Sequence, residues 1–239
     1  MTPEIYQTKD EQDVLKIELD VIKEQFERGD LTGELAEVGV MWGGSAKLIK
    51  EIFPDSTWHL FDTFTGLPNT IKDGVDPEHY MEGDMMVDYE RVKRFFKDDK
   101  EVYFHQGIFP QETGKVIEGK RFAFVHIDVD IYQSTRDAML ALWSLVNING
   151  SIMVHDYPAH NGVKKAIDEL FDGVGTFYVG KWKERELNPM YSFGSRQLVI
   201  RKRIEKPLNL YVEKPEVEWV YKLDKKTLKQ LYGEKFPIY

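Results

Sequence analysis

The stretch FVHIDVD at residues 124–130 decides the fold, because it is an apolar run that ends in Asp128 and Asp130. A second apolar run, IMVHD at residues 152–156, also ends in aspartate. The residues between the runs predict a helix over 134–145, which supplies the crossover that parallel neighbouring strands require. Ligands bind at the carboxyl ends of the strands in open α/β sheets, so we expect these aspartates to point at one substrate.

The rest of the chain extends this alternation of strands and helices. Apolar residues at helical spacing predict a helix over 10–28, and a strand, a helix and a strand are predicted at 33–40, 45–53 and 57–61. A polar connection without a clear period is expected over 69–84. The further predicted helices lie near 89–97 and 163–171, and the further predicted strands near 101–105, 176–179 and 197–201.

This order of elements predicts one α/β domain with a doubly wound, mostly parallel, Rossmann-like sheet. The expected parts are an N-terminal helical segment at 1–30, the core at 31–202 and a C-terminal tail at 203–239. The length of 239 residues agrees with a single large domain.

Composition and charge narrow the classes of function. The formal net charge of −9 argues against sequence-independent binding to nucleic acid or to an anionic membrane. The chain contains no cysteine, which excludes disulfides, thiolate metal sites and cysteine nucleophiles. No apolar run approaches the roughly 18 residues of a membrane span, and MTPE at residues 1–4 lacks the pattern of a secretory signal. These features predict a cytoplasmic protein that acts on a small molecule.

A glycine-rich turn, EVGVMWGGS at residues 37–45, suggests a nucleotide cofactor. Taken alone it is a weak signal, because ordinary tight turns share the pattern. Dinucleotide-binding turns carry a glycine where this chain has Met41, so a pyrophosphate would be crowded. S-adenosylmethionine has no phosphate but carries an ammonium and a sulfonium group, for which Glu37 is a suitable partner. Asp62, at the end of the second strand, is placed to bind the cofactor ribose. The candidate cofactor-binding residues are Glu37, Gly39, Gly43, Ser45, Asp62, Gln106 and Asp128.

The strand-end acids suggest a metal-assisted reaction, with Asp128 and Asp130 as catalytic candidates. Residues i and i+2 of a strand share a face, so both side chains are expected to reach one site. A divalent ion, Mg²⁺ or Mn²⁺, on Asp128 and Asp156 would relieve the repulsion between the carboxylates and orient an acceptor hydroxyl, whose proton Asp130 would take. Solvated loop acids are the alternative. His155 is either a polar neighbour or a third ligand, and imidazole suits Mn, Fe or Zn better than Mg.

Other polar residues near these strands have weaker assignments. Tyr132, Gln133 and Tyr157 lie beside the acids and are candidates for contact with the acceptor, although each could equally serve packing. His59 and His105 are expected to be hydrogen-bonded residues of their strands rather than ligands.

Four segments, in this order, resemble the macrocin O-methyltransferase family (TylF type): EVGVMWGGSA at 37–46, FDTFTGLP at 61–68, HIDVDIYQSTRDA at 126–138, and HDY at 155–157 with GVKKA at 162–166. The resemblance implies a class I methyltransferase that uses S-adenosylmethionine, commonly with a metal, to methylate hydroxyls on sugars of natural products or related glycosides. It also implies that Asp128 and Asp156 are metal ligands and that Asp130 is the general base or a further ligand. The chain departs from the family at His155, where an aspartate usually completes an Asp-Asp-Tyr triplet, and this leaves the identity of the metal and the need for one open.

Two other classes of function stay open at this point. An NAD-dependent oxidoreductase has the same fold but is disfavoured by Met41. A non-catalytic binding module would retain the fold with an altered site, and His155 is the one sign of such a change. Fold analogy does not identify the acceptor or the oligomeric state, so a homo-oligomer is also left open.

Overall fold

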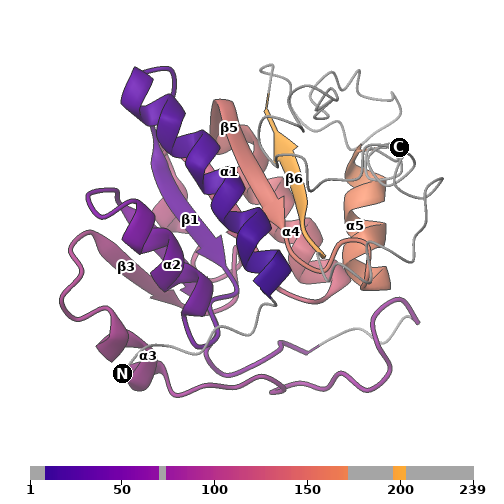
Figure 1. The fold of residues 1–239 in the computed structure, drawn as a ribbon. Helices are drawn as coiled ribbons and strands as arrows, with labels where there is room; N and C mark the ends of the chain where they lie inside the picture. The colour runs from indigo at the N-terminus through magenta and orange to yellow at the C-terminus, as the bar shows by residue number, and fades with distance from the viewer. Residues whose placement is uncertain (1–8, 70–73, 172–195, 203–239) are drawn as a thin grey trace.

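The computed structural model describes residues 9–69, 74–171 and 196–202 of the chain. Their strands are β1 (Glu34–Val38), β2 (Trp58–Asp62), β3 (Val102–Gln106), β4 (Phe122–Ile127), β5 (Val146–Val154) and β6 (Leu198–Arg201). They form one sheet with the order β3-β2-β1-β4-β5-β6 (Figure 1). Only β6 is antiparallel to its neighbour among these strands, so the expectation of a mostly parallel sheet is confirmed.

Helices cover both faces of this sheet, as a doubly wound fold requires. Figure 1 shows α1 and α2 on the near face and α4 behind the strands. The helices are α1 (Lys9–Arg28), α2 (Gly44–Ile52), α3 (Tyr89–Phe95), α4 (Tyr132–Leu142) and α5 (Asn161–Phe171), with short 3₁₀ turns at Gly114–Ile117 and Trp143–Leu145.

The central strand β4 shows why the sequence forms this sheet. All six of its residues are buried, because a parallel strand with helices on both faces has no exposed side. Successive side chains alternate between two cores: Phe124 packs with the residues beneath α1 and α2, and Val125 packs with those beneath α4 and α5. The continuous apolar run in the sequence is therefore a strand buried on both faces.

Helix α1 buries its apolar face against the near side of the sheet. Leu15, Leu19 and Ile22 recur at helical spacing and are fully buried against the sheet. The helix ends at Gly29, which adopts a left-handed φ of 75°, and the amide of Asp30 donates to the carbonyl of Gln25. The predicted helix over 10–28 agrees with these bounds.

A long connection between β2 and α3 folds back on itself near the carboxyl ends of the strands. The amide of Leu67 donates to the carbonyl of Asp84 at 2.8 Å, and the amide of Gly83 donates back to the carbonyl of Leu67 at 2.9 Å. A Cβ at Gly66 would lie 2.3 Å from the Gly83 carbonyl oxygen, so this close approach requires glycine. Further along, the Asp76 carboxylate accepts the first amide of α4, from Tyr132, at 2.8 Å. The described part of this polar connection is therefore tied down at two points.

Most predicted elements agree with the structure within a few residues. The helix expected over 134–145 begins two residues earlier and passes into a 3₁₀ turn at Trp143. The strand expected at 176–179 and the tail at 203–239 lie outside the described residues. None of the helices in the described ranges has the length and hydropathy needed to cross a membrane.

Candidate active site

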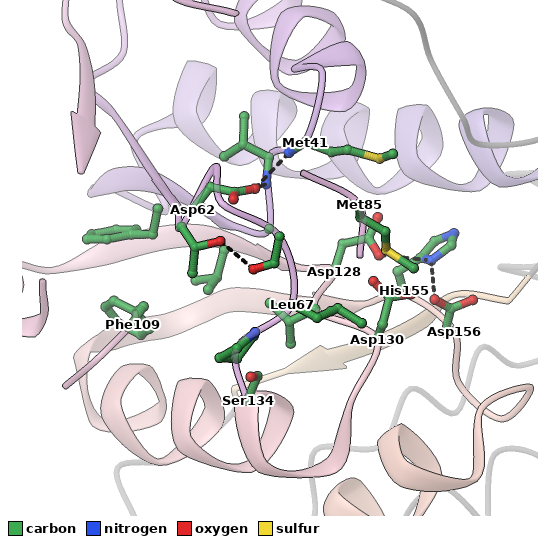
Figure 2. Close-up of a pocket in the computed structure, with 18 of the residues that line it drawn as sticks. Met41, Asp62, Leu67, Met85, Phe109, Asp128, Asp130, Ser134, His155 and Asp156 are labelled. Carbon is green, nitrogen blue, oxygen red and sulfur yellow. Dashed lines mark hydrogen bonds and ion pairs between the residues drawn. The ribbon is translucent and has the colours of Figure 1, made fainter. Parts of the chain in front are cut away.

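A cavity of about 400 Å³ opens where the strand order reverses between β1 and β4. This is the position at which open α/β sheets bind ligands. Its wall is formed by the glycine-rich turn, the ends of β2 and β3, the connection after β2, and the ends of β4 and β5. Figure 2 shows Asp62 and Met41 on one side of the cavity and Asp128, Asp130, His155 and Asp156 gathered on another.

The glycine-rich turn approaches β4 so closely that it requires a glycine at position 39. Gly39 has a φ of 88°, and a Cβ there would lie 1.7 Å from the carbonyl oxygen of Asp128. Met41 also has a left-handed φ, of 48°, and its backbone lies over the end of β2. Two bonds hold the turn there, since the Asp62 carboxylate accepts the amides of Val40 at 2.7 Å and Met41 at 2.8 Å.

Asp62 thus organises the turn as well as lining the cavity. A third amide, from Phe64, donates to its other oxygen, Oδ1, at 2.6 Å. A carboxylate oxygen has two acceptor positions, so Oδ1 can accept one further donor such as a ribose hydroxyl. This support of the turn was missed by the sequence analysis, which assigned Asp62 to the ribose alone.

Glu37 lies beneath the turn and does not line the cavity. Its side chain is fully buried, and Oε1 accepts the Ser45 hydroxyl at 2.6 Å and lies 2.7 Å from Nδ1 of His126. Burial raises the pKa of Glu37, although His126 and Ser45 oppose the shift. Oε2 is buried without a hydrogen-bond partner, so this oxygen is the one available to a cationic group.

Two other cofactor candidates also lie outside the cavity wall, whereas Gly39, Ser45, Asp62 and Asp128 line it. Gly43 faces helix α3, where a Cβ would lie 2.9 Å from the ring of Phe96. Gln106 is exposed and its side-chain amide donates to the carbonyl of Thr63 at 3.4 Å. Gly43 and Gln106 contact neighbouring segments in this structure, and their contact with a cofactor stays a prediction.

Asp128, Asp130 and Asp156 all line the cavity, but strand alternation is not the reason. Strand β4 ends at Ile127, before both of its acids. Asp130 reaches the cavity through a left-handed turn with a φ of 62°, and Asp156 has a φ of 61° directly after β5. Strained backbone of this kind is common at functional sites.

The electrostatics of the three acids differ. Burial favours the neutral form of Asp128, but the interactions with His155, His126 and Arg196 outweigh it and lower its pKa to about 2. Burial raises the pKa of Asp130 well above its usual value, and the charges of Asp128 and Asp156 add to that shift. One carboxylate is thus held ionised beside another that binds protons readily.

His155 lies among three carboxylates. Its side chain is 8% exposed, and Nδ1 lies 3.1 Å from Oδ1 of Asp128 and 3.1 Å from Oδ2 of Asp156. Nε2 lies 3.7 Å from Oε1 of Glu11, which comes from α1. Burial disfavours the charged imidazole, yet Asp128, Asp156 and Glu11 together raise the pKa of His155 far above its usual value. Arg196 completes the cluster by contacting Asp156 Oδ1 and Glu11 Oε1, each at 3.0 Å.

His160 and Arg196 are site residues that the sequence analysis missed. His160 precedes α5, and its Nδ1 lies 3.5 Å from Asp156 and 3.8 Å from Asp130. Its spacing of five residues from His155 fits neither a strand nor a helix face. Arg196 lies 40 residues beyond Asp156 in the chain, so only the return of β6 to the sheet brings it to the cavity.

The donor atoms fit a divalent ion. Two groups of three residues have ligand atoms that all lie within 4.8 Å of one another. The first group is Asp128, His155 and Asp156, and the second is Asp130, Asp156 and His160. Carboxylate oxygen and imidazole nitrogen are ligands for Mn, Fe and Zn. The buried Nδ1 of His155 has no hydrogen-bond partner, as expected of an atom that awaits a ligand.

The three acceptor-contact candidates do not line the cavity. Tyr157 is 1% exposed in the core beneath α5, where its hydroxyl contacts Asp168 at 2.9 Å. The hydroxyl of Tyr132 contacts Glu169 at 2.6 Å, and the amide of Gln133 contacts Asp137 at 2.8 Å. Each of the three bonds to a neighbouring helical residue in this structure, and its contact with the acceptor stays a prediction.

Comparisons with known proteins agree with this fold. The family model described as macrocin-O-methyltransferase (TylF) matches residues 6–173. A demethyldecarbamoylnovobiocin O-methyltransferase from Streptomyces niveus is 30% identical over 154 residues, which cover 59% of this chain and 58% of the relative. An 8-demethyl-8-(2,3-dimethoxy-α-L-rhamnosyl)-tetracenomycin-C 4′-O-methyltransferase from Streptomyces olivaceus is 30% identical over 172 residues, 61% of this chain and 65% of the relative. The chain thus spans less than two thirds of the length of these curated relatives.

Solved structures show the same architecture. The O-methyltransferase NovP aligns with a TM-score of 0.59 and 26% identity over 79% of this chain and 80% of NovP. The calicheamicin methyltransferase CalS11 aligns with a TM-score of 0.58 and 17% identity over 70% of this chain and 73% of CalS11. The sheet and the cavity at its switch point therefore define a Rossmann-like class I methyltransferase fold. Within that class, the chain belongs to the macrocin O-methyltransferase (TylF) family, as the resemblance of its four motifs predicts.

Proposed function

We propose that this protein transfers the methyl group of S-adenosylmethionine to a hydroxyl on the sugar of a glycosylated small molecule. The observation that carries the proposal is the meeting of Asp128, Asp130 and Asp156 in one cavity beside the glycine-rich turn. The name of the Streptomyces olivaceus relative, a 4′-O-methyltransferase of a rhamnosyl-tetracenomycin, supports a sugar acceptor. A cytoplasmic location and self-association stay predictions.

The reaction is an in-line displacement, so the protein mainly aligns the two reactants and excludes water. The bond between sulfur and methyl carbon breaks as the acceptor oxygen bonds to that carbon, and the hydroxyl proton passes to the Asp130 carboxylate. The products are S-adenosylhomocysteine and a methyl ether. A sugar hydroxyl is a weak nucleophile at neutral pH, which is why a base at this position matters.

The residues of the cavity divide these tasks. The proposed donor site is the glycine-rich turn, with Oε2 of Glu37 near the ammonium group and Oδ1 of Asp62 at the ribose. A divalent ion would be held by Asp128, Asp156 and His155. Such an ion would lower the pKa of the acceptor hydroxyl.

The test is a binding and transfer assay. The purified chain is titrated with S-adenosylhomocysteine by calorimetry, then incubated with S-adenosylmethionine and a panel of rhamnosides and related glycosides, with methylated products detected by mass spectrometry. We expect binding of the nucleoside and a gain of one methyl group on a sugar oxygen. A chain that binds NAD but not S-adenosylhomocysteine would contradict the proposal.

A further inference from the structure

We propose that Nδ1 of His155 is itself a metal ligand and makes the site prefer Mn²⁺ over Mg²⁺. The inference rests on the metal-assisted part of the proposed function and adds the selectivity of that site. Nδ1 belongs to a side chain that is 8% exposed, lies 3.1 Å from a carboxylate oxygen on each side, and makes no hydrogen bond. This buried nitrogen lies between two carboxylates but is not aligned to donate a hydrogen bond to either. Its position is the one expected of a metal-ligand atom.

Glu11 lies near the other ring nitrogen of His155. A metal-ligating histidine usually presents its other ring nitrogen to a carboxylate, which places the proton on that nitrogen and leaves a lone pair for the metal. Oε1 of Glu11 lies 3.7 Å from Nε2, just beyond hydrogen-bond distance, so both ring nitrogens are buried without a hydrogen-bond partner in this structure. Glu11 is fully buried and is held by Nε of Arg196 at 3.0 Å. We therefore assign Glu11 as a positioning residue that acts through His155.

Arg196 makes the charge balance compatible with an ion. Its Nη1 contacts Oδ1 of Asp156, whereas the atom nearest His155 is Oδ2. One oxygen of Asp156 is thus occupied by a guanidinium and the other faces the ligand group. The acids favour a protonated His155, so a bound ion would have to displace that proton. The two carboxylates and the neutral imidazole would then carry two negative charges for a doubly charged ion.

The chemistry of the donors sets the preference. Mg²⁺ is a hard cation that takes oxygen ligands and keeps several waters, whereas Mn²⁺ accepts imidazole as well as carboxylate. An aspartate at position 155 would give an all-oxygen site, so the single change to histidine is what moves the selectivity.

The experiment measures metal binding without turnover. The full chain is stripped with a chelator and titrated with Mn²⁺ or Mg²⁺ alone by calorimetry, and the Mn²⁺ complex is examined by pulsed EPR for coupling to ¹⁴N. We expect Mn²⁺ to bind at least about tenfold more tightly than Mg²⁺ and to show nitrogen coupling. His155→Asp should abolish the coupling and narrow the affinity difference. His79→Gln, at an exposed histidine outside the cavity wall, is the matched control and should change neither.

A second variant separates the role of Glu11 from folding. Glu11→Gln should keep the nitrogen coupling but weaken Mn²⁺ binding by about 10- to 100-fold, the usual effect of losing an outer carboxylate. Mn²⁺ binding without nitrogen coupling, or an unchanged preference in His155→Asp, would overturn the inference. Failure to bind either ion would also overturn it and would identify His155 as a protonated partner of the acids. Nitrogen coupling in a chain that does not bind S-adenosylhomocysteine would contradict the proposed function instead.

Discussion

At the scale of single residues, Asp130 combines an unusual backbone with an unusual environment. Its left-handed φ turns the carboxylate into the cavity, and burial together with Asp128 and Asp156 raises its pKa. A general base works best when its pKa approaches the working pH, so this environment suits proton transfer.

We expect Asp130→Asn to lower kcat about 100- to 10,000-fold, because an amide cannot take the hydroxyl proton. The affinity for S-adenosylhomocysteine should change little. Single-turnover methyl transfer and calorimetry measure the two quantities separately. Asp137→Asn, which removes a carboxylate bonded to Gln133 outside the cavity, serves as the control and should keep normal turnover. Normal turnover of Asp130→Asn would remove this residue from the mechanism.

Asp62 gives a prediction about the cofactor turn. Asp62→Asn leaves one acceptor oxygen, so either the amides of Val40 and Met41 or the amide of Phe64 loses its acceptor. Each lost bond to a buried donor costs about 1–3 kcal/mol, so we expect a lower Tm and an affinity for S-adenosylhomocysteine reduced about tenfold or more. Asp84→Asn, at a half-buried acid that accepts one amide, should leave cofactor affinity unchanged. An unaltered affinity in Asp62→Asn would show that the turn is held by other contacts.

The candidate site was predictable from sequence only in part. The aspartates are adjacent to apolar runs, so their convergence at one edge of the sheet follows from the parallel topology. His160 and Arg196 were not predictable in this way, because their places depend on how a loop and an antiparallel strand return to the sheet. The sequence pattern also cannot say which way a side chain turns after a strand has ended, so the bond of Tyr157 to Asp168 was not predictable.

At the scale of elements, the connection after β2 is fastened to helix α4. Asp76 accepts the amide of Tyr132, the first residue of α4, and thus caps the helix from a distant segment. The same connection supplies Leu67, Tyr80 and Met85 to the cavity wall. This hydrogen bond therefore fixes the connection, and with it this part of the cavity wall, to helix α4.

Asp76→Ala should remove the cap and loosen the wall. We expect a loss of about 1 kcal/mol in the free energy of unfolding, together with a higher KM for the glycoside acceptor. Denaturant unfolding and steady-state kinetics measure these effects. Glu78→Ala removes an exposed acid from the same segment and should alter neither quantity. A change in stability with an unchanged KM would separate the cap from acceptor binding.

The elements themselves followed well from the sequence, for identifiable reasons. Strand β4 is continuously apolar and α1 is amphipathic, so burial alone dictates their type. The antiparallel direction of β6 was not predictable, because the apolar pattern of a short strand does not show its direction relative to its neighbour. The two fixed points of the connection after β2 were also hidden, since they are bonds between backbone groups and one distant carboxylate.

At the scale of the whole molecule, stability against acid depends on histidines remote from the cavity. His59 contacts Glu34 at 2.6 Å and His105 at 2.9 Å, as expected for hydrogen-bonded strand residues. Burial lowers the pKa of His105 to about 4 and also lowers that of His59. In the unfolded chain both imidazoles bind protons near pH 6.5, so acid favours the unfolded state.

We therefore expect these two imidazoles to lower the Tm as the pH falls from about 6.5 towards 4, because the unfolded chain binds protons there that the folded imidazoles do not bind. The raised pKa values of Glu37 and Asp130 act in the opposite direction. His105→Gln should flatten this part of the profile. Thermal unfolding at a series of pH values checks the prediction, with His79→Gln as a control at an exposed histidine. A profile that His105→Gln leaves as steep as before would assign the acid sensitivity to other groups.

The contact between Glu11 and Arg196 has a consequence for biosynthesis. Because Arg196 follows Glu11 by 185 residues, they can meet only after the chain as far as Arg196 has left the ribosome. Until then Glu11 and Asp156 lack their contact with this guanidinium. The packing of α1 against this side of the site should therefore be completed only after β6 has joined the sheet.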